Sequence, residues 1–231
     1  MAGPTHEEKK RLLQNHYLLG KLSGGEIDML LQYARVERHR AGQEIFAKGS
    51  PGQSMFAVLR GTVKISAPSP AGKEIVLNLI GPGEIFGEIA LLDGLERSGD
   101  AAAMTDCELL TLNRRDVIPI LEKRPDICMT LLKILCERLR RTSEQVEDVL
   151  FRHLEGRLAK ALLQLADNVG RRHAAGISVD LPLSQQELGN IVGGSRESVN
   201  KQLQVWQKAG LLTLAKGSIT IRDLAAIEQL V

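Results

Sequence analysis

Residues 183–203 read LSQQELGNIVGGSRESVNKQL, and this stretch decides the architecture of the C-terminal part of the chain. Ser184 is followed three residues later by Glu187, which is the capping-box pattern at the start of a short helix. Two glycines then end this helix, and Ser195 is placed to cap a second one. Two short helices joined by a glycine turn of three to four residues predict a helix-turn-helix.

The second of these helices has two different faces. On a helical wheel, Val199, Leu203 and Trp206 share one face and are predicted to pack inward. The opposite face carries polar and charged residues: Arg196, Glu197, Asn200, Lys201, Gln204, Gln207 and Lys208. These side chains suit base edges and phosphates in a DNA major groove. The alternative is an ordinary amphipathic surface helix whose exposed charges bind nothing.

The residues around this motif complete a small domain. Two short β-prone runs at 211–214 and 218–221 predict a hairpin, which would form a wing beside the second helix. A last short helix is expected at 224–230, and a helix at 157–168 precedes a polar loop at 170–176. Residues 151–231 hold ten basic and seven acidic side chains, a balance that permits contact with nucleic acid.

A long helix is predicted from Pro125 onward, because the sequence has no glycine until Gly156 and proline suits a first helical turn. Apolar or small residues recur along it in alternating steps of four and three: Cys128, Leu132, Leu135, Leu139, Thr142, Val146 and Val149. This spacing is typical of the seam of a two-chain coiled coil. The alternative is a core helix that packs against its own domain.

Residues 42–99 are rich in glycine and in short β-prone runs. The runs lie at 44–46, 55–59, 62–66, 74–80 and 84–89. Short strands with a turn about every ten residues predict an all-β sandwich or roll. Two short amphipathic helices are expected before it, at 7–19 and 25–33.

A second candidate site lies in FGEIA (residues 86–90) and DGLERSG (residues 93–99). Gly87 would let the backbone approach a ligand closely, and the amides that follow it would point at a phosphate. Arg97 would offer several donors to phosphate oxygens, Ser98 a hydroxyl, and Glu88 would accept from a ribose hydroxyl. The alternative is a structural ion pair between Glu88 and Arg97.

Three motifs in register resemble the cyclic-AMP receptor protein (CRP/FNR) family of bacterial transcription regulators. FGEIALL followed by ERS is similar to the family's phosphate-binding cassette, residues 183–203 to its helix-turn-helix, and TSEQV (142–146) to its dimer helix. The resemblance covers roughly residues 10–225. It implies an α+β fold with three parts: a jelly-roll-like β-roll that binds a cyclic nucleotide (1–125), a dimerisation helix and hinge (126–152), and a winged helix-turn-helix that binds DNA (153–231).

The resemblance also implies site residues. The cyclic phosphate and ribose would be held by Gly87, Glu88, Ile89, Ala90, Arg97 and Ser98. The rest of the pocket would be lined by Ile65, Leu77, Asn78 and Phe86, with Thr142 and the partner's Ser143 touching the adenine. Contacts to DNA would come from Ser195, Arg196, Glu197, Ser198, Asn200 and Lys201. The effector expected is cyclic AMP ahead of cyclic GMP, with no metal.

The implied partners are double-stranded DNA, a second copy of the chain in a homodimer, and RNA polymerase near residues 171–176. Five positions depart from the family pattern. Lys201 stands where arginine is usual, Gln202 where an apolar residue is usual, Gly99 and Asp100 follow Ser98 where alanine and a large residue are common, and His153 is a weaker helix cap than aspartate. Thr142 could instead be a polar residue that sets the register of the seam.

Composition excludes several other classes of protein. The 231 residues are 25% charged and 43% hydrophobic, which is ordinary for a folded domain protein. No apolar run reaches the length of a membrane span, and MAGPTHEEKK lacks the apolar core of a secretory signal, so we expect a cytoplasmic protein without a membrane partner. Once both domains are assigned, no length and no catalytic motif remain for an enzyme.

Another effector, or none, is the main alternative to cyclic-nucleotide control. An iron–sulfur sensor needs about four cysteine ligands, whereas Cys107, Cys128 and Cys136 are three and scattered. None of the five histidines is an obvious haem ligand. A regulator of the same architecture that binds DNA constitutively, or that senses a different small molecule, stays open.

Overall fold

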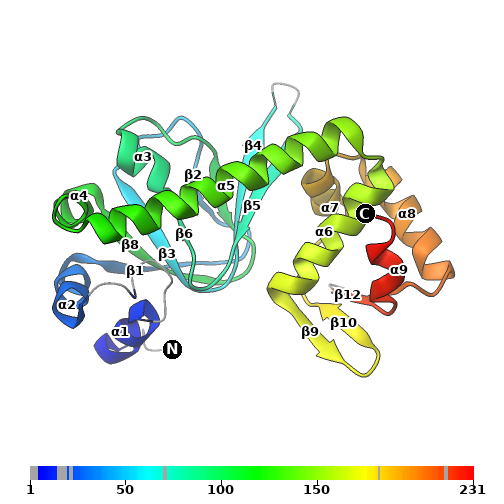
Figure 1. Cartoon of the computed structure of the whole chain (residues 1–231), viewed down its shortest axis with the longest axis horizontal. Coiled ribbons are helices and arrows are strands. Elements are labelled where there is room, and N and C mark those ends of the chain that lie inside the picture. Colours follow the sequence, from blue (N-terminus) through cyan, green and yellow to red (C-terminus); the bar gives the residue numbers. More distant parts are fainter. Residues whose placement is uncertain (1–4, 15–19, 21–22, 70–71, 182, 216–217) are drawn as a thin grey trace. The chain divides into compact units, whose positions relative to one another are not determined.

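The computed structural model of the chain describes residues 5–14, 20, 23–69, 72–181, 183–215 and 218–231, and it divides into two compact units (Figure 1). The first unit contains residues up to 67 together with 77–139, and the second contains residues 68–76 together with 140–231. The fold is α+β, as predicted, with a β-rich N-terminal part, a long helix and a C-terminal helix-turn-helix with a small sheet.

The N-terminal part is a roll of two four-stranded antiparallel sheets, with strand orders β1-β8-β3-β6 and β2-β7-β4-β5. Its strands are β1 (Arg35–His39), β2 (Glu44–Phe46), β3 (Ser54–Arg60), β4 (Val63–Pro68), β5 (Glu74–Ile80), β6 (Ile85–Phe86), β7 (Asp100–Ala103) and β8 (Cys107–Asn113). Its helices are α1 (His6–Gln14), α2 (Gly24–Tyr33), α3 (Glu88–Asp93) and α4 (Arg114–Lys123). The described part of α1 ends at Gln14, and the predicted continuation to residue 19 lies outside the described residues.

Strands β2 and β5 coincide with the predicted runs, but the predicted strand at 84–89 is wrong beyond Phe86. Gly87 has φ +77°, a left-handed conformation that few other residues adopt, and the chain turns there into α3. Strands β1, β7 and β8 were not among the predicted runs. Strand β8 pairs with β1 and β3 and so lies inside the first sheet.

Helix α5 (Pro125–Phe151) is the long helix that the sequence predicts. One face is buried at Ile127 and Leu131, which pack into the core of the first unit. The predicted seam lies elsewhere on the helix: Leu132 is 51% exposed and Val146 is 55% exposed. The alternative in which the seam residues pack into the core of their own domain is therefore wrong for Leu132 and Val146. Among the described helices, none is both long and apolar enough to cross a membrane.

The second unit contains the helix-turn-helix and a four-stranded antiparallel sheet of order β11-β12-β10-β9. Its remaining elements are α6 (Leu154–Val169), β9 (Gly170–His173), β10 (Gly176–Val179), α7 (Gln185–Val192), α8 (Arg196–Lys208), β11 (Leu212–Ala215), β12 (Ser218–Ile221) and α9 (Leu224–Glu228). The predicted wing is β11 and β12. The predicted polar loop at 170–176 is wrong, because its first residues form strand β9, which pairs with β10 along one edge of the sheet.

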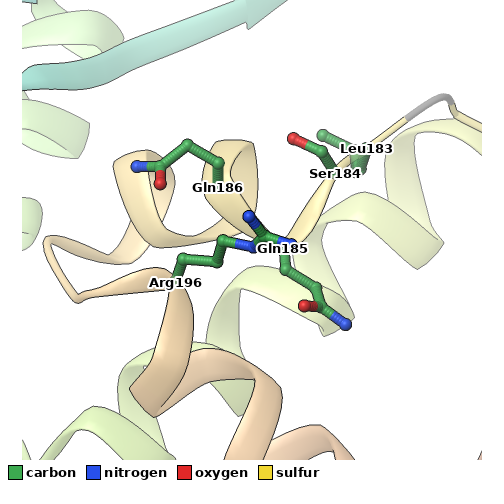
Figure 2. A pocket seen from close by; sticks show the side chains of 5 residues that line it. All are labelled: Leu183, Ser184, Gln185, Gln186 and Arg196. Carbon is green, nitrogen blue, oxygen red and sulfur yellow. The ribbon is translucent and has the colours of Figure 1, made fainter.

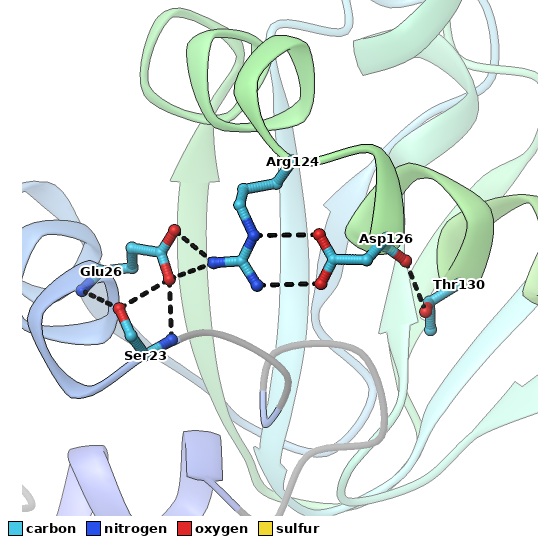
Figure 3. Close-up of polar contacts among 5 residues, drawn as sticks. All are labelled: Ser23, Glu26, Arg124, Asp126 and Thr130. Atoms are coloured by element: carbon cyan, nitrogen blue, oxygen red, sulfur yellow. Dashed lines mark hydrogen bonds and ion pairs between the residues drawn. The ribbon is translucent and has the colours of Figure 1, made fainter.

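A polar network ties α2 to the start of α5 (Figure 3). Arg124 donates from Nε and Nη2 to the two carboxylate oxygens of Asp126, both at 2.9 Å, and from Nη1 to Glu26. Glu26 also accepts from the Ser23 amide and hydroxyl, both at 2.7 Å. The hydrogen bonds from Arg124 and then from Ser23 lower the pKa of Glu26 from 4.5 to about 2.

We expect the substitution Glu26→Gln to remove a pH-dependent part of the stability. Because the pKa of Glu26 is lowered on folding, its charge stabilises the fold fully above pH 4.5, and this contribution is lost as the pH falls toward about 2. The difference in free energy of unfolding between wild type and variant should therefore be constant near neutral pH and shrink across that range. Urea unfolding at a series of pH values measures it.

The matched control is Glu122→Gln, which removes an exposed glutamate on α4. This variant keeps the Glu26–Arg124 network, so it should retain the stabilising contribution of the Glu26 charge. A Glu26→Gln difference that stayed constant down to pH 2 would show that Arg124 and Ser23 do not stabilise the charge of Glu26.

Candidate functional site

The first candidate site surrounds Arg97, a buried arginine with 5% of its surface exposed. Its Nη1 donates to the carbonyl of Gly87 at 2.9 Å and its Nη2 to the hydroxyl of Ser54 at 3.1 Å. The guanidinium lies over the ring of Phe46, 4.2 Å from the ring centroid. Burial lowers the pKa of Arg97 from its ordinary value, and the nearby charge of Glu88 opposes this shift. Arginine thus brings a positive charge into an apolar wall.

That wall is aromatic. Phe46, Phe56 and Phe86, three of the four phenylalanines of the chain, have ring centroids 5.0–5.9 Å apart. They come from β2, β3 and β6, so both sheets of the roll contribute to one cluster. Aromatic faces attract a cation, and the cluster therefore compensates part of the cost of burying the guanidinium.

Two glycines leave space for the Arg97 side chain. A Cβ atom at Gly87 would lie 2.7 Å from Arg97 Nη1, and one at Gly52 would lie 2.2 Å from the Ala90 Cβ and 3.3 Å from Arg97 Nε. The loop that carries Gly52 is also bound to Arg97 by its backbone, since the Arg97 amide donates to the Ser50 carbonyl at 2.9 Å. Gly52 was not among the predicted site residues, because its close contact with Ala90 joins residues far apart in the sequence.

Glu88 faces a partner that the sequence did not suggest. Its side chain is 1% exposed, and Oε1 accepts from Arg138 Nη1 of helix α5 at 2.5 Å. Arg138 also donates to the carbonyl of Ile85. The alternative of a Glu88–Arg97 ion pair is therefore wrong. No local pattern could have identified Arg138, because it lies fifty residues further along the chain.

The site keeps two buried polar atoms without a hydrogen-bond partner among the described residues. One is a donor, Arg97 Nε, and the other an acceptor, Glu88 Oε2. Buried polar groups are nearly always paired in folded proteins, because an unmade hydrogen bond costs roughly 1–3 kcal/mol. A cationic donor beside an acceptor matches a ligand that carries both an anionic oxygen and a hydroxyl, which is the chemistry of a sugar phosphate.

The remaining predicted pocket residues differ in exposure. Phe86 and Ala90 are each 1% exposed, whereas Ile89 is 45% exposed and Ser98 is exposed. Ile65 and Leu77 both lie beside the residue after Ser98, Gly99: their side chains are 3.7 and 3.9 Å from where a Cβ atom of Gly99 would be, and Asn78 is half-buried. Thr142 and Ser143 are exposed residues of α5.

The second candidate site is built on the two helices that the sequence predicted. Ser184 and Glu187 form the predicted capping box at the start of α7. Helix α7 ends at Gly193, which has φ +63°, and Ser195 caps α8 by accepting from the Ser198 amide at 3.1 Å. Gly189 is required for the close approach of the turn, because a Cβ atom there would lie 2.9 Å from the Gly194 carbonyl oxygen.

Helix α8 buries one face and exposes the other, as predicted. Val199, Leu203 and Trp206 are at most 2% exposed. The exposed face carries Ser195, Arg196, Glu197, Ser198, Lys201, Gln204, Gln207 and Lys208. The backbone amide of Glu197 and the hydroxyl of Ser195 lower the pKa of the Glu197 carboxyl, which favours its charged, hydrogen-bond-accepting form.

Asn200 is half-buried and connects the two helices. Its side-chain oxygen accepts from Gln185 Nε2 of α7 at 2.9 Å and from Gln204 Nε2 at 3.5 Å. The structure therefore places Asn200 in a bridge between α7 and α8, while its neighbour Lys201 is exposed.

An open pocket lies where α7 begins, beside the start of α8 (Figure 2). It is lined by Leu183, Ser184, Gln185, Gln186 and Arg196. The first amides of a helix and an arginine side chain both attract phosphate. Figure 2 shows that Gln185 and Arg196 both line this pocket. The helix-turn-helix thus offers charged and amide groups on one exposed side.

We expect the substitution Gly52→Ala to destabilise the fold through the Arg97 site. The added methyl group would meet the Ala90 Cβ at 2.2 Å, so the loop or α3 must shift. Overpacking of this kind costs roughly 1–3 kcal/mol. Thermal unfolding followed by circular dichroism should show a lower midpoint for Gly52→Ala.

Gly25→Ala is the matched control. Nothing lies within 4 Å of a Cβ atom at Gly25, which is in helix α2, so alanine should be neutral or slightly stabilising there. A Gly52→Ala protein as stable as the Gly25→Ala protein would contradict the close packing described around Arg97.

Two domain families match this chain. Residues 36–124 match the cyclic nucleotide-binding domain, and residues 156–230 match the Crp-like helix-turn-helix domain. The first match contains the Arg97 site, and the second contains helices α7 and α8. The Arg97 site therefore lies in a domain whose family is named for cyclic nucleotide binding, and α7 and α8 lie in a domain whose family is named for the helix-turn-helix.

Relatives extend the similarity over most of the chain. A CRP-like cAMP-activated global transcriptional regulator of Mycobacterium tuberculosis is 36% identical, over 79% of this chain and 81% of that protein. A cyclic AMP receptor protein of Thermus thermophilus is 32% identical, over 90% and 94%. The solved structure of the c-di-GMP responsive regulator CLP of Xanthomonas campestris has a TM-score of 0.76 at 26% identity, over 86% and 99%.

The two domain matches and the sequence identity to these relatives establish the class of this protein, and the exposed polar face of α8 agrees with it. The family consists of transcription regulators that are not enzymes. The chain belongs to the CRP/FNR family of DNA-binding transcription regulators, with a cyclic nucleotide-binding domain followed by a Crp-like helix-turn-helix.

Proposed function

We propose that a cyclic nucleotide, with cyclic AMP as the preferred effector, binds at Arg97 and controls DNA binding by this regulator. The observation that carries this proposal is the pair of buried polar atoms without partners, Arg97 Nε and Glu88 Oε2. A cyclic phosphate would accept from the guanidinium, and the ribose hydroxyl would donate to the carboxylate. Names of relatives support cyclic AMP, since two of them are described as cAMP-activated or as a cyclic AMP receptor.

Helix α5 would connect the ligand site to the rest of the protein. Arg138 of α5 donates to the same carboxylate, Glu88, that the ribose would approach. A ligand that changes the hydrogen bonds of Glu88 therefore acts on a residue of α5. For the switch to work, the ligand must bind the DNA-competent arrangement more tightly than the inactive one.

We propose a homodimer that pairs along α5. The seam residues Leu132, Val146 and Val149 are 49–55% exposed, and their spacings of fourteen residues (two heptads) and three residues keep them in one stripe. A second copy of the chain would bury this stripe. Thr142 lies in the same stripe, which is consistent with its proposed contact to the adenine.

The dimer would bind a near-palindromic operator through two copies of α8, whose half-sites lie about 34 Å apart. Arg196 and Lys201 would donate to guanine, and Glu197 would accept from cytosine. Lys201 is a point charge where the family usually has arginine, so base reading there should be looser. A contact with RNA polymerase at residues 171–176 stays a prediction of the resemblance; residues 171–175 are exposed.

A regulator of the same architecture with a different effector, or none, is the second candidate. Arg97 donates to Gly87 and Ser54, and Glu88 pairs with Arg138, so both charged groups have protein partners. A relative that is 26% identical is described as responsive to c-di-GMP. DNA binding that is equally tight with and without cyclic AMP would favour this candidate.

We expect Arg97→Ala to abolish cyclic AMP binding, because the phosphate loses its main cationic donor. Isothermal titration of the full chain with cyclic AMP and cyclic GMP measures the effect, and the loss of a charge-assisted hydrogen bond predicts an affinity at least about tenfold weaker. The matched control is Arg115→Ala, since the Arg115 side chain is 81% exposed on the neighbouring helix α4. Equal nucleotide affinity in both variants would disprove the assignment of the site.

A test of the dimer places a charge on the seam. Leu132→Lys should shift the chain from dimer to monomer in sedimentation equilibrium, because a buried lysine on the seam lacks a partner. Phe151→Lys is the control: Phe151 is 81% exposed and lies off the seam, so dimerisation should persist. The proposal fails if wild type is a monomer, or if both variants associate as wild type does.

A further inference from the structure

One carboxylate oxygen outside the exposed face of α8 accepts two hydrogen bonds from that helix. Glu155, in the first turn of α6, accepts at Oε1 from Gln202 Nε2 at 2.9 Å and from Trp206 Nε1 at 3.3 Å. Gln202 and Trp206 are four residues apart, so they lie on the same side of α8 in successive turns. One carboxylate oxygen of Glu155 therefore contacts two successive turns of α8.

The two hydrogen bonds differ in exposure: the one from Gln202 is exposed to solvent, as is Glu155 itself, whereas the one from Trp206 is partly buried. Trp206 is 2% exposed, and its indole N–H would be buried without an acceptor if Glu155 were removed. Gln202 is the residue noted above for replacing an apolar residue usual in the family. Its hydrogen bond to Glu155 accounts for a polar residue at this position, because the side-chain amide of Gln202 reaches Glu155 instead of packing in the apolar face.

The apolar contacts of α8 and its hydrogen bonds to Glu155 constrain the helix in different ways. Val199, Leu203 and Trp206 bury one face of α8, and this burial holds the helix against the domain without being directional. Hydrogen bonds are directional, so two of them to one oxygen oppose rotation of α8 about its own axis. Reading base edges requires side chains to be held within roughly 10–20° of their productive orientation.

We propose that Glu155 is a positioning residue for base recognition: through Gln202 and Trp206 it fixes the rotation of α8, and thereby the direction in which Arg196 and Lys201 point. The inference rests on the DNA-binding function of the helix-turn-helix. It does not depend on which effector the protein senses. Contacts to phosphates tolerate small rotations, whereas contacts to base edges do not. Loss of Glu155 should therefore reduce specificity more than general DNA affinity.

The test compares two DNA probes. The first is the duplex that the wild-type chain selects from a random-sequence pool, and the second is a shuffled duplex of the same length and composition. Dissociation constants for the full chain are measured on both probes, with and without cyclic AMP. Glu155→Ala should bind the selected duplex about tenfold more weakly, as for the loss of one base contact, and the shuffled duplex within about twofold of wild type.

Two further variants serve as rescue and control. Glu155→Gln keeps an acceptor oxygen, so it should recover most of the lost specificity. Glu228→Gln removes an exposed glutamate of α9 in the same unit and should leave both dissociation constants unchanged. Because Trp206 is the single tryptophan of the chain, its fluorescence reports on the contact directly: emission should change in Glu155→Ala and stay near wild type in Glu155→Gln.

Gln202→Ala covers the case in which Glu155→Ala fails to fold. It keeps the Trp206 hydrogen bond and should lose part of the specificity while its thermal unfolding midpoint stays near that of wild type. The inference is overturned if the ratio of the two dissociation constants is unchanged in the Glu155 and Gln202 variants, or if both constants rise equally. A wild type insensitive to cyclic AMP would refute the proposed effector but leave this ratio, and so this inference, intact.

Discussion

The structure of the N-terminal unit depends on one buried cation. Arg97 is 5% exposed, stacks over Phe46 and donates to Gly87 and Ser54. A buried guanidinium is unfavourable without partners, so the surrounding backbone is arranged for it: Gly52 and Gly87 leave space where any Cβ atom would collide. Its Nε has no hydrogen-bond partner among the described residues, so this donor is available to an anionic ligand.

The carboxylate of Glu88 connects the surroundings of Arg97 to helix α5. Glu88 is almost fully buried: its Oε1 accepts from Arg138, and its Oε2 has no hydrogen-bond partner among the described residues. Arg138 belongs to the same helix as the apolar stripe proposed for dimerisation. In the second unit, Glu155 holds two donors of α8, the helix proposed to read DNA. In each unit, then, a glutamate accepts hydrogen bonds from a helix on which the proposed activity depends.

The sequence predicted the parts whose signals are local. The capping box of Ser184 and Glu187, the inward face of α8 and the start of α5 at Pro125 follow from neighbouring residues, and the structure confirms them. Strand β9 was mistaken for a loop because its Arg171, Arg172 and His173 are exposed, and pairing with β10 makes it a strand. Arg138 and Gly52 could not be predicted, since each acts on a residue more than thirty positions away in the sequence.

The most direct test of the central claim is a crystal structure of the full chain grown with cyclic AMP. We predict a cyclic phosphate oxygen within hydrogen-bond distance of Arg97 Nε and a ribose hydroxyl on Glu88 Oε2, the two atoms of this site that lack partners among the described residues. A nucleotide bound elsewhere, with Arg97 still held by Gly87 and Ser54 alone and Glu88 by Arg138 alone, would contradict it.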